Sequence, residues 1–301
     1  MNILQKISYY GVVESAKIAF SMICSGCKRA WDTWRVRNTP IYNNPTSDEL
    51  DQIESDLRSL GVEIFDYMPS PAAFQEFQAK NYFPEDYLGG RRSVVWTEKL
   101  LEHWIAFDRL KLTNFGAGDV YVDVAAASSP WAHSVRKYLG IEAYAIDLGA
   151  VGEAYKKLPY YRTENATATC FTAASVKGAS LHCAYEMFLG NDDVQFIREV
   201  ARILAPGGKV VILPLYMHTH YCAYSTREYF GKGYSDPTAK EYVRLDCLGV
   251  PSSRKYNAVM FKNRVLDTIV SEGMSYSLLA LRNRVELGKD IYCHFILEIC
   301  R

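Results

Sequence analysis

Two aspartates follow apolar runs of the sequence and could together bind a nucleoside. Asp123 comes near the end of the run 119–126 and precedes the segment 125–129 (AAASS), whose small side chains let the backbone approach a ligand. Asp147 comes near the end of the run 142–148, where a carboxylate can accept both hydroxyls of a ribose. A tight turn plus a helix-capping aspartate explains these residues equally well, because short motifs have low specificity.

Two histidines, one residue apart, follow the apolar run 209–217. An imidazole of His218 or His220 can accept the proton of a substrate hydroxyl. The pair also suits a metal ion if a carboxylate joins it. We favour the proton acceptor over the metal ligand and expect no metal, although for either residue alone a loop histidine without chemistry is more common.

The elements that must position these residues alternate between strands and helices. Strands are predicted at 119–126, 142–148, 178–188, 209–217, 275–283 and 291–301, and helices at 131–140, 192–204 and 261–273. This alternation indicates a parallel sheet covered on both faces, with ligands bound beyond the carboxyl ends of its strands. We therefore predict an α/β fold, a doubly wound and mostly parallel sheet with a C-terminal β-hairpin, and expect it to be seven-stranded, with one strand more than these six ranges.

The rest of the chain predicts a cover for this sheet. Residues 1–115 are expected to form a helical N-terminal extension and substrate cover, with a helix over 48–60 capped by Ser47 and another over 93–112. Residues 3–34 carry an amphipathic stripe that could lie on a membrane surface, but packing on its own domain is more common and is favoured here. Within the domain 116–301, the insertion 216–256 has no clear period and is interpreted as a lid.

The segment 204–215 (LAPGGKVVILPL) adds a more specific signal. A helix with one apolar face runs into Pro206-Gly207-Gly208, a turn that leads straight into an apolar strand. Here the chain resembles the class I S-adenosylmethionine-dependent methyltransferase family, in which a Leu-x-Pro-Gly-Gly turn precedes the fifth strand. The resemblance spans roughly residues 119–301 and includes the closing hairpin, which a typical NAD-binding Rossmann domain lacks.

The resemblance implies S-adenosylmethionine as the cofactor and assigns residues to it. The segment 123–129 resembles the family's Asp-x-Gly-x-Gly-x-Gly loop, which places Asp123 near the methionine amine. Asp147 matches the ribose-binding acid, and His182 could face the cofactor from its strand. The remaining assignments put Ala125, Ala127 and Ser129 at the usual glycine positions and Asn165 and Ala166 at the pair that contacts adenine. The alanines depart from the pattern, because non-glycine residues pay to enter positive φ.

The resemblance also implies a reaction and an acceptor. The segment 182–188 (HCAYEMF) is similar to a strand end of small-molecule methyltransferases of the glycan and natural-product type, with Glu186 matching and Met187 standing where a histidine often does. We expect O-methylation of a polar small molecule, with a sugar hydroxyl favoured. His218 or His220 is then the expected proton acceptor.

Composition limits the partners that the chain can have. The 34 basic residues balance 34 acidic ones, which argues against a nucleic-acid partner. The eight cysteines are scattered, and the first apolar run is interrupted by charges, so we expect reduced thiols in a cytoplasmic protein without a signal peptide. Two alternatives stay open: an NAD-dependent oxidoreductase, and a catalytically silent methyltransferase-like scaffold, which the alanine-substituted loop would suit.

Overall fold

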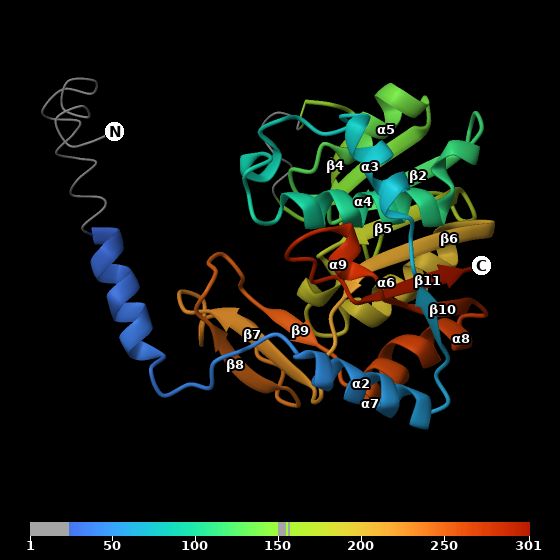
Figure 1. Ribbon diagram of the computed structural model, residues 1–301. Helices are drawn as coiled ribbons and strands as arrows, with labels where there is room; N and C mark the ends of the chain where they lie inside the picture. Colours follow the sequence, from blue (N-terminus) through green and yellow to red (C-terminus); the bar gives the residue numbers. More distant parts are fainter. Residues whose placement is uncertain (1–23, 150–154, 156) are drawn as a thin grey trace, which may run out of the picture. The chain divides into compact units, whose positions relative to one another are not determined.

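The computed structural model describes residues 24–149, 155 and 157–301 (Figure 1). They form two compact units. The larger contains Pro45–Tyr221 and Arg254–Arg301, and the smaller contains the described residues before Pro45 together with Cys222–Ser253. Most of the predicted amphipathic stripe, residues 3–23, lies outside the described residues. None of the helices in the described ranges has both the length and the apolar character needed to cross a membrane.

An eight-stranded sheet, in the order β1-β10-β11-β6-β5-β2-β3-β4, is the centre of the larger unit. Its strands are β1 (Ile64–Tyr67), β2 (Val120–Val124), β3 (Glu142–Asp147), β4 (Tyr161–Thr163), β5 (Val176–His182), β6 (Leu204–Leu215), β10 (Ser275–Leu281) and β11 (Phe295–Cys300). The predicted count of seven strands is wrong. The six predicted ranges lack β1 and β4, the two edge strands, which have only 4 and 3 residues and therefore show no periodic pattern.

Most neighbouring strands of this sheet run parallel. The exception is β11, which pairs antiparallel with both β10 and β6. The α/β class and the large, mostly parallel sheet therefore agree with the prediction. The chain between β10 and β11 contains α9 (Arg284–Leu287) and is longer than a simple hairpin turn. Because β2, β3, β5 and β6 are parallel, their carboxyl ends lie at the same edge of the sheet. The last residues of these strands are Val124, Asp147, His182 and Leu215.

Helices cover both faces of the sheet. Helix α4 (Trp96–Leu110) packs on β5 and β6, and α5 (Trp131–Leu139) packs on β2 and β3. Val211 and Leu213 of β6 belong to the same buried cluster as α4, whereas Val210 and Ile212 alternate to the opposite face, where they are also buried. Helix α6 (Asp192–Ile203) and α8 (Asp267–Ser271) contact each other, and α6 also contacts β6.

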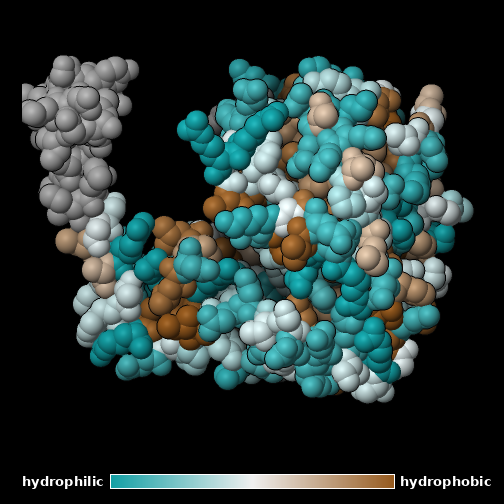
Figure 2. Space-filling model, viewed as in Figure 1, coloured by the Kyte–Doolittle hydropathy of each residue, from teal (hydrophilic) through white to brown (hydrophobic). Residues whose placement is uncertain are grey.

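The larger unit contains two further helices and several shorter helical segments. They are α2 (Ser47–Ser59), α3 (Pro71–Ala79), α7 (Ala258–Phe261), the π-helical turn η4 (Lys262–Leu266), and the 3-10 turns η1 (Tyr87–Gly89), η2 (Leu112–Asn114) and η3 (Tyr185–Met187). On the face shown in Figure 2, brown apolar side chains are scattered in small groups among teal and white ones. Scattered exposed apolar residues of this kind are ordinary for a folded chain.

The start of α2 corrects one detail of the sequence interpretation. The N-cap is Thr46, not Ser47. The Glu49 backbone N–H donates to Thr46 Oγ1 at 3.3 Å, and the Thr46 backbone N–H donates to Glu49 Oε2 at 2.8 Å. Either hydroxyl can cap a helix, but only Thr46 has a glutamate three residues later to complete this reciprocal pair.

The smaller unit contains a helix that the sequence predicted and strands that it did not. Residues 24–35 are helical, in agreement with the predicted stripe. Strands β7 (Cys222–Thr226) and β8 (Lys240–Arg244) pair in parallel, and Ile41 forms a bridge with Val243. The boundary between the units falls within β9 (Ser253–Lys255). The segment 216–256 therefore contains strands, contrary to the expectation of irregular chain, because each strand is too short to show a clear alternation.

Candidate functional site

A cavity of about 340 Å³ lies at the carboxyl ends of the parallel strands of the larger unit. Its volume is within the range of about 300–1,000 Å³ that is typical of small-molecule sites. The ends of β2, β3, β4 and β5 contribute its lining: Ala125, Ala127, Ile146, Asp147, Leu148, Glu164, Asn165, Ala166, Thr167, Cys183, Ala184, Met187, Phe188 and Asp192. Five residues predicted to hold the cofactor, Ala125, Ala127, Asp147, Asn165 and Ala166, are thus brought together.

The loop after β2 has the backbone conformation that its alanines were expected to resist. Ala125 has a φ of 54° and Ala127 a φ of 46°, both in the left-handed region. This region costs a non-glycine residue about 1–2 kcal/mol. The loop is nevertheless tied to β3, because the Ala126 backbone N–H donates to the Ile146 carbonyl at 3.1 Å. The site is therefore formed at the expense of local strain.

Asp147 is the central polar group of the cavity wall. Its Oδ2 accepts a hydrogen bond from the Ala127 backbone N–H at 2.9 Å, and its Oδ1 accepts one from the Gly149 backbone N–H at 3.0 Å. A carboxylate has about four lone-pair positions, so each oxygen keeps one for a ligand. Two adjacent hydroxyls, such as those of a ribose, match this acceptor pair.

Asp123 lies deeper than the cavity wall. Its side chain is 1% exposed and Oδ2 has no hydrogen-bond partner among the described residues. Burial raises the pKa of Asp123 to about 8, and the nearby Asp147 charge adds to this effect. Asp123 is absent from the described lining of the cavity. A buried carboxyl oxygen without a partner is suited to a ligand's ammonium group, which would restore its charge.

His182 and Ser129 are likewise absent from the described lining of the cavity. The His182 Nε2 is 2.8 Å from Ser180 Oγ and 3.9 Å from Asp123 Oδ1. Its ring stacks on that of His103, with centroids 4.0 Å apart. Burial, with the charge of Lys99 and the neighbouring imidazole, lowers the pKa of His182 well below its ordinary value. His182 is therefore neutral and forms no ion pair with Asp123.

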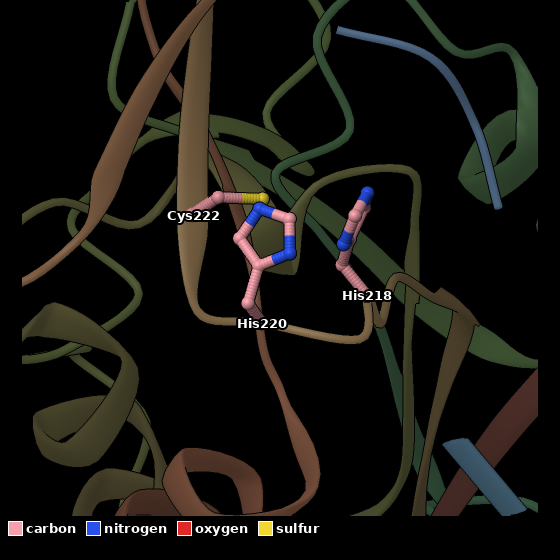
Figure 3. A group of neighbouring side chains, drawn as sticks. All are labelled: His218, His220 and Cys222. Carbon is pink, nitrogen blue, oxygen red and sulfur yellow. The ribbon is translucent and has the colours of Figure 1, made fainter. Parts of the chain in front are cut away.

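His218 and His220 lie on the segment that leaves β6, which Figure 3 shows together with Cys222, the first residue of β7. The His218 backbone N–H donates to the Tyr256 carbonyl at 2.8 Å. Their Nδ1 atoms lie 3.2 and 3.3 Å from the hydroxyl of Thr219 between them. Neither histidine is among the described residues that line the cavity.

A group of polar residues that sequence reasoning missed joins α4 to the end of β5. We call it the α4 cluster; it consists of Lys99, Glu102, Cys183, Tyr216 and Tyr292. The ammonium of Lys99 donates to Glu102 Oε1 at 2.9 Å and to Cys183 Sγ at 2.6 Å. The hydroxyls of Tyr216 and Tyr292 lie 3.2 and 3.5 Å from the same sulfur. The available signal was the spacing of Lys99, Glu102 and His103, three polar residues on the buried face of a helix.

Comparison with known proteins agrees with this geometry. Residues 116–212, from just before β2 into β6, match a family model described as a methyltransferase domain. The fold and the matched segment thus define an α/β chain with a segment that is similar to methyltransferase domains. No curated protein matches the chain.

Several solved structures are similar at low identity. Geranyl diphosphate C-methyltransferase from Streptomyces coelicolor A3(2) is 12% identical over 75% of this chain and 97% of that chain, with a TM-score of 0.41. A SAM-dependent methyltransferase from Methanosarcina mazei is 14% identical over 64% and 96%, with a TM-score of 0.39. Phosphoethanolamine N-methyltransferase 2 from Haemonchus contortus is 14% identical over 68% and 46%, also at 0.39. Likenesses this low carry no information about ligand or reaction.

Proposed function

We propose that the chain is an S-adenosylmethionine-dependent methyltransferase whose cofactor binds in the cavity at the carboxyl ends of β2 and β3. The observation that carries the proposal is the meeting of the Ala125–Ala127 loop, Asp147 and the Asn165-Ala166 pair around one cavity. The family match to residues 116–212 supports it, because that segment supplies all of these residues.

The cavity residues fit the parts of this cofactor. Asp147 would accept the ribose hydroxyls, and the backbone after β2 would approach the methionine part. Asn165 and Ala166 would contact the adenine. The unpartnered oxygen of Asp123 suits the methionine ammonium, with Ser129 and His182 holding the surrounding layer. The bound sulfonium supplies an electrophilic methyl group, so the protein's own task is to position the two reactants.

For the acceptor we propose a hydroxyl group of a polar small molecule, with a sugar as the favoured class. The sequence resemblance to glycan-type enzymes supports this class. His218 and His220 are the sequence-based candidates for the proton acceptor, and their imidazoles have the required chemistry. Their positions on the chain after β6 leave them outside the described cavity wall.

Calorimetry with S-adenosylhomocysteine tests the proposal directly. We expect micromolar binding to the wild-type chain, and a loss of about 1–3 kcal/mol in Asp147→Ala, because two charge-assisted hydrogen bonds disappear. Asp51→Ala is the matched control, since Asp51 is exposed on α2. Absence of binding to the folded wild type would favour the silent scaffold, and binding of NAD alone would favour the oxidoreductase.

A further inference from the structure

The α4 cluster is costly to bury, and stability alone does not explain it. Glu102 is fully buried, and the Lys99 side chain is 16% exposed. Withdrawing two opposite charges from water costs several kcal/mol per ion, and packed apolar residues of the same volume often stabilise a fold equally well or better. Buried ionisable groups beside a cleft are a common sign of a functional site.

Cys183 connects this cluster to the cofactor cavity. It follows β5 directly, and it is the member of the cluster that belongs to the described cavity lining. Its φ of 51° is in the left-handed region, which is costly for a residue with a β-carbon. Cys183 is therefore the residue that belongs both to the buried cluster and to the wall of the cavity where the proposed reaction takes place.

The charges of the cluster favour proton movement toward Glu102. Burial by itself lowers the pKa of Lys99, but attraction to Glu102 and to the Cys183 sulfur raises it well above its ordinary value, so the ammonium stays charged. Burial raises the pKa of Cys183 to about 12, with repulsion from Glu102 adding to the effect, and the group is a thiol. The Cys183 sulfur lies 3.3 Å from Glu102 Oε1, to which the thiol donates.

Two further carboxyl groups face the cluster. Glu98, one helical turn before Glu102, accepts hydrogen bonds from the backbone N–H groups of Tyr292 and Cys293 at 3.1 Å each. Burial and then repulsion from Glu102 raise the pKa of Glu98 to about 8. Burial also raises the pKa of Glu186, on η3, whose Oε2 has no hydrogen-bond partner among the described residues. Burial raises the pKa of Glu102 as well, and Lys99, which is bonded to Glu102 alone of these three, opposes that rise.

We propose that Glu102 receives, through the Cys183 thiol, the proton that the acceptor hydroxyl loses during methyl transfer. The inference rests on the proposed function. The O–H bond of the acceptor breaks and its proton moves to the Cys183 sulfur, while the thiol's own proton moves to a Glu102 oxygen. The acceptor oxygen uses the freed electron pair to bond the methyl carbon, whose bond to the sulfonium sulfur breaks. Lys99 orients both groups, and the proton later leaves Glu102 for solvent.

The coupling of these protons can be measured without turnover, as the rate at which iodoacetamide labels Cys183 at pH 9. Glu102→Gln keeps the shape of the side chain but leaves the Lys99 charge next to the sulfur uncompensated. The thiolate is then stabilised, and we expect Cys183 to be labelled about tenfold faster, since one pKa unit changes the thiolate fraction tenfold. Mass spectrometry of the Cys183 peptide gives the rate, with the exposed Cys24, Cys27 and Cys170 as internal references.

A second variant and a control keep the test decisive. Lys99→Met leaves the Glu102 charge unopposed and should slow the labelling of Cys183. If Glu102→Gln does not fold, this decrease in rate tests the same coupling. Glu298→Gln is the matched control, because Glu298 is a buried carboxylate paired with Arg109 and Lys209 rather than with the cluster. It should leave the labelling rate of Cys183 unchanged.

Binding of S-adenosylhomocysteine distinguishes a failure of the proposed function from a failure of the proton relay. Without such binding to the wild type, the proposed function itself fails. If the ligand binds and slows the labelling of Cys183, and Glu102→Gln accelerates labelling of the free protein, the relay is supported. If the ligand binds but the folded Glu102→Gln protein is labelled at the wild-type rate, the relay is overturned while the proposed function stands. A ligand that binds without slowing the labelling of Cys183 overturns it as well.

Discussion

Replacing Ala127 by glycine should stabilise the protein, although such a change usually weakens a fold. Ala127 has a φ of 46°, where its β-carbon costs about 1–2 kcal/mol. Glycine removes this strain, but the greater conformational entropy of the unfolded chain lowers the free energy of unfolding by about 0.5–1 kcal/mol. The difference predicts a gain of about 0.5–1 kcal/mol for Ala127→Gly. Ala125→Gly should give a similar gain because its φ is 54°.

Urea unfolding followed by circular dichroism measures this free energy. Ala125 and Ala127 are close in the chain, so their effects need not add. The free energy gained by the double variant should differ from the sum of the two single gains by a few tenths of a kcal/mol. Ala132→Gly is the control, since Ala132 is buried in α5 with ordinary helical neighbours. It should lose about 1 kcal/mol or more. A loss of similar size in Ala127→Gly would refute the left-handed loop.

Three further predictions concern other parts of the larger unit. Asp123→Asn should become progressively more stable than the wild type from pH 5 to pH 8 in urea unfolding at several pH values. The folded protein holds a proton on Asp123 up to a pKa of about 8 while the unfolded chain has already lost it, so the wild type loses stability as pH rises. Arg282→Met should cost about 3 kcal/mol by thermal unfolding at pH 7. It removes the two Arg282 hydrogen bonds of 2.6 and 2.8 Å from the buried Glu54 carboxylate, which keeps only Arg58 and His294 as partners. Thr46→Ala should cost about 1 kcal/mol by the same method, and Ser47→Ala much less, because only Thr46 caps α2.

The elements with strong local patterns were predictable from the sequence. Strands β2, β3, β5 and β6 are apolar runs bounded by turns or helices, and α6 carries its apolar residues at helical spacing. The α/β class, and the edge of the sheet where ligands bind, follow from the alternation of these elements. Asp147 and the loop after Asp123 were identifiable for the same reason, since they come at the ends of those runs.

The rest depends on contacts between segments that are far apart in the sequence. Strand β1 owes its place to pairing with β10, more than 200 residues later, and nothing in its four residues indicates that partner. The α4 cluster joins Lys99 to Cys183 and Tyr292, whose proximity only the folded sheet creates. The burial of Asp123 was not predictable from the sequence either, because the position of a residue in a strand does not determine how deeply that end of the strand is buried.

The central claim is that Asp147 and the loop after β2 hold an adenosyl group at the carboxyl edge of the sheet. A crystal structure of the chain with S-adenosylhomocysteine tests it most directly. The account predicts both ribose hydroxyls within hydrogen-bond distance of the Asp147 carboxylate and the adenine beside Asn165 and Ala166. A nucleoside bound elsewhere, or one whose ribose leaves Asp147 untouched, would contradict it.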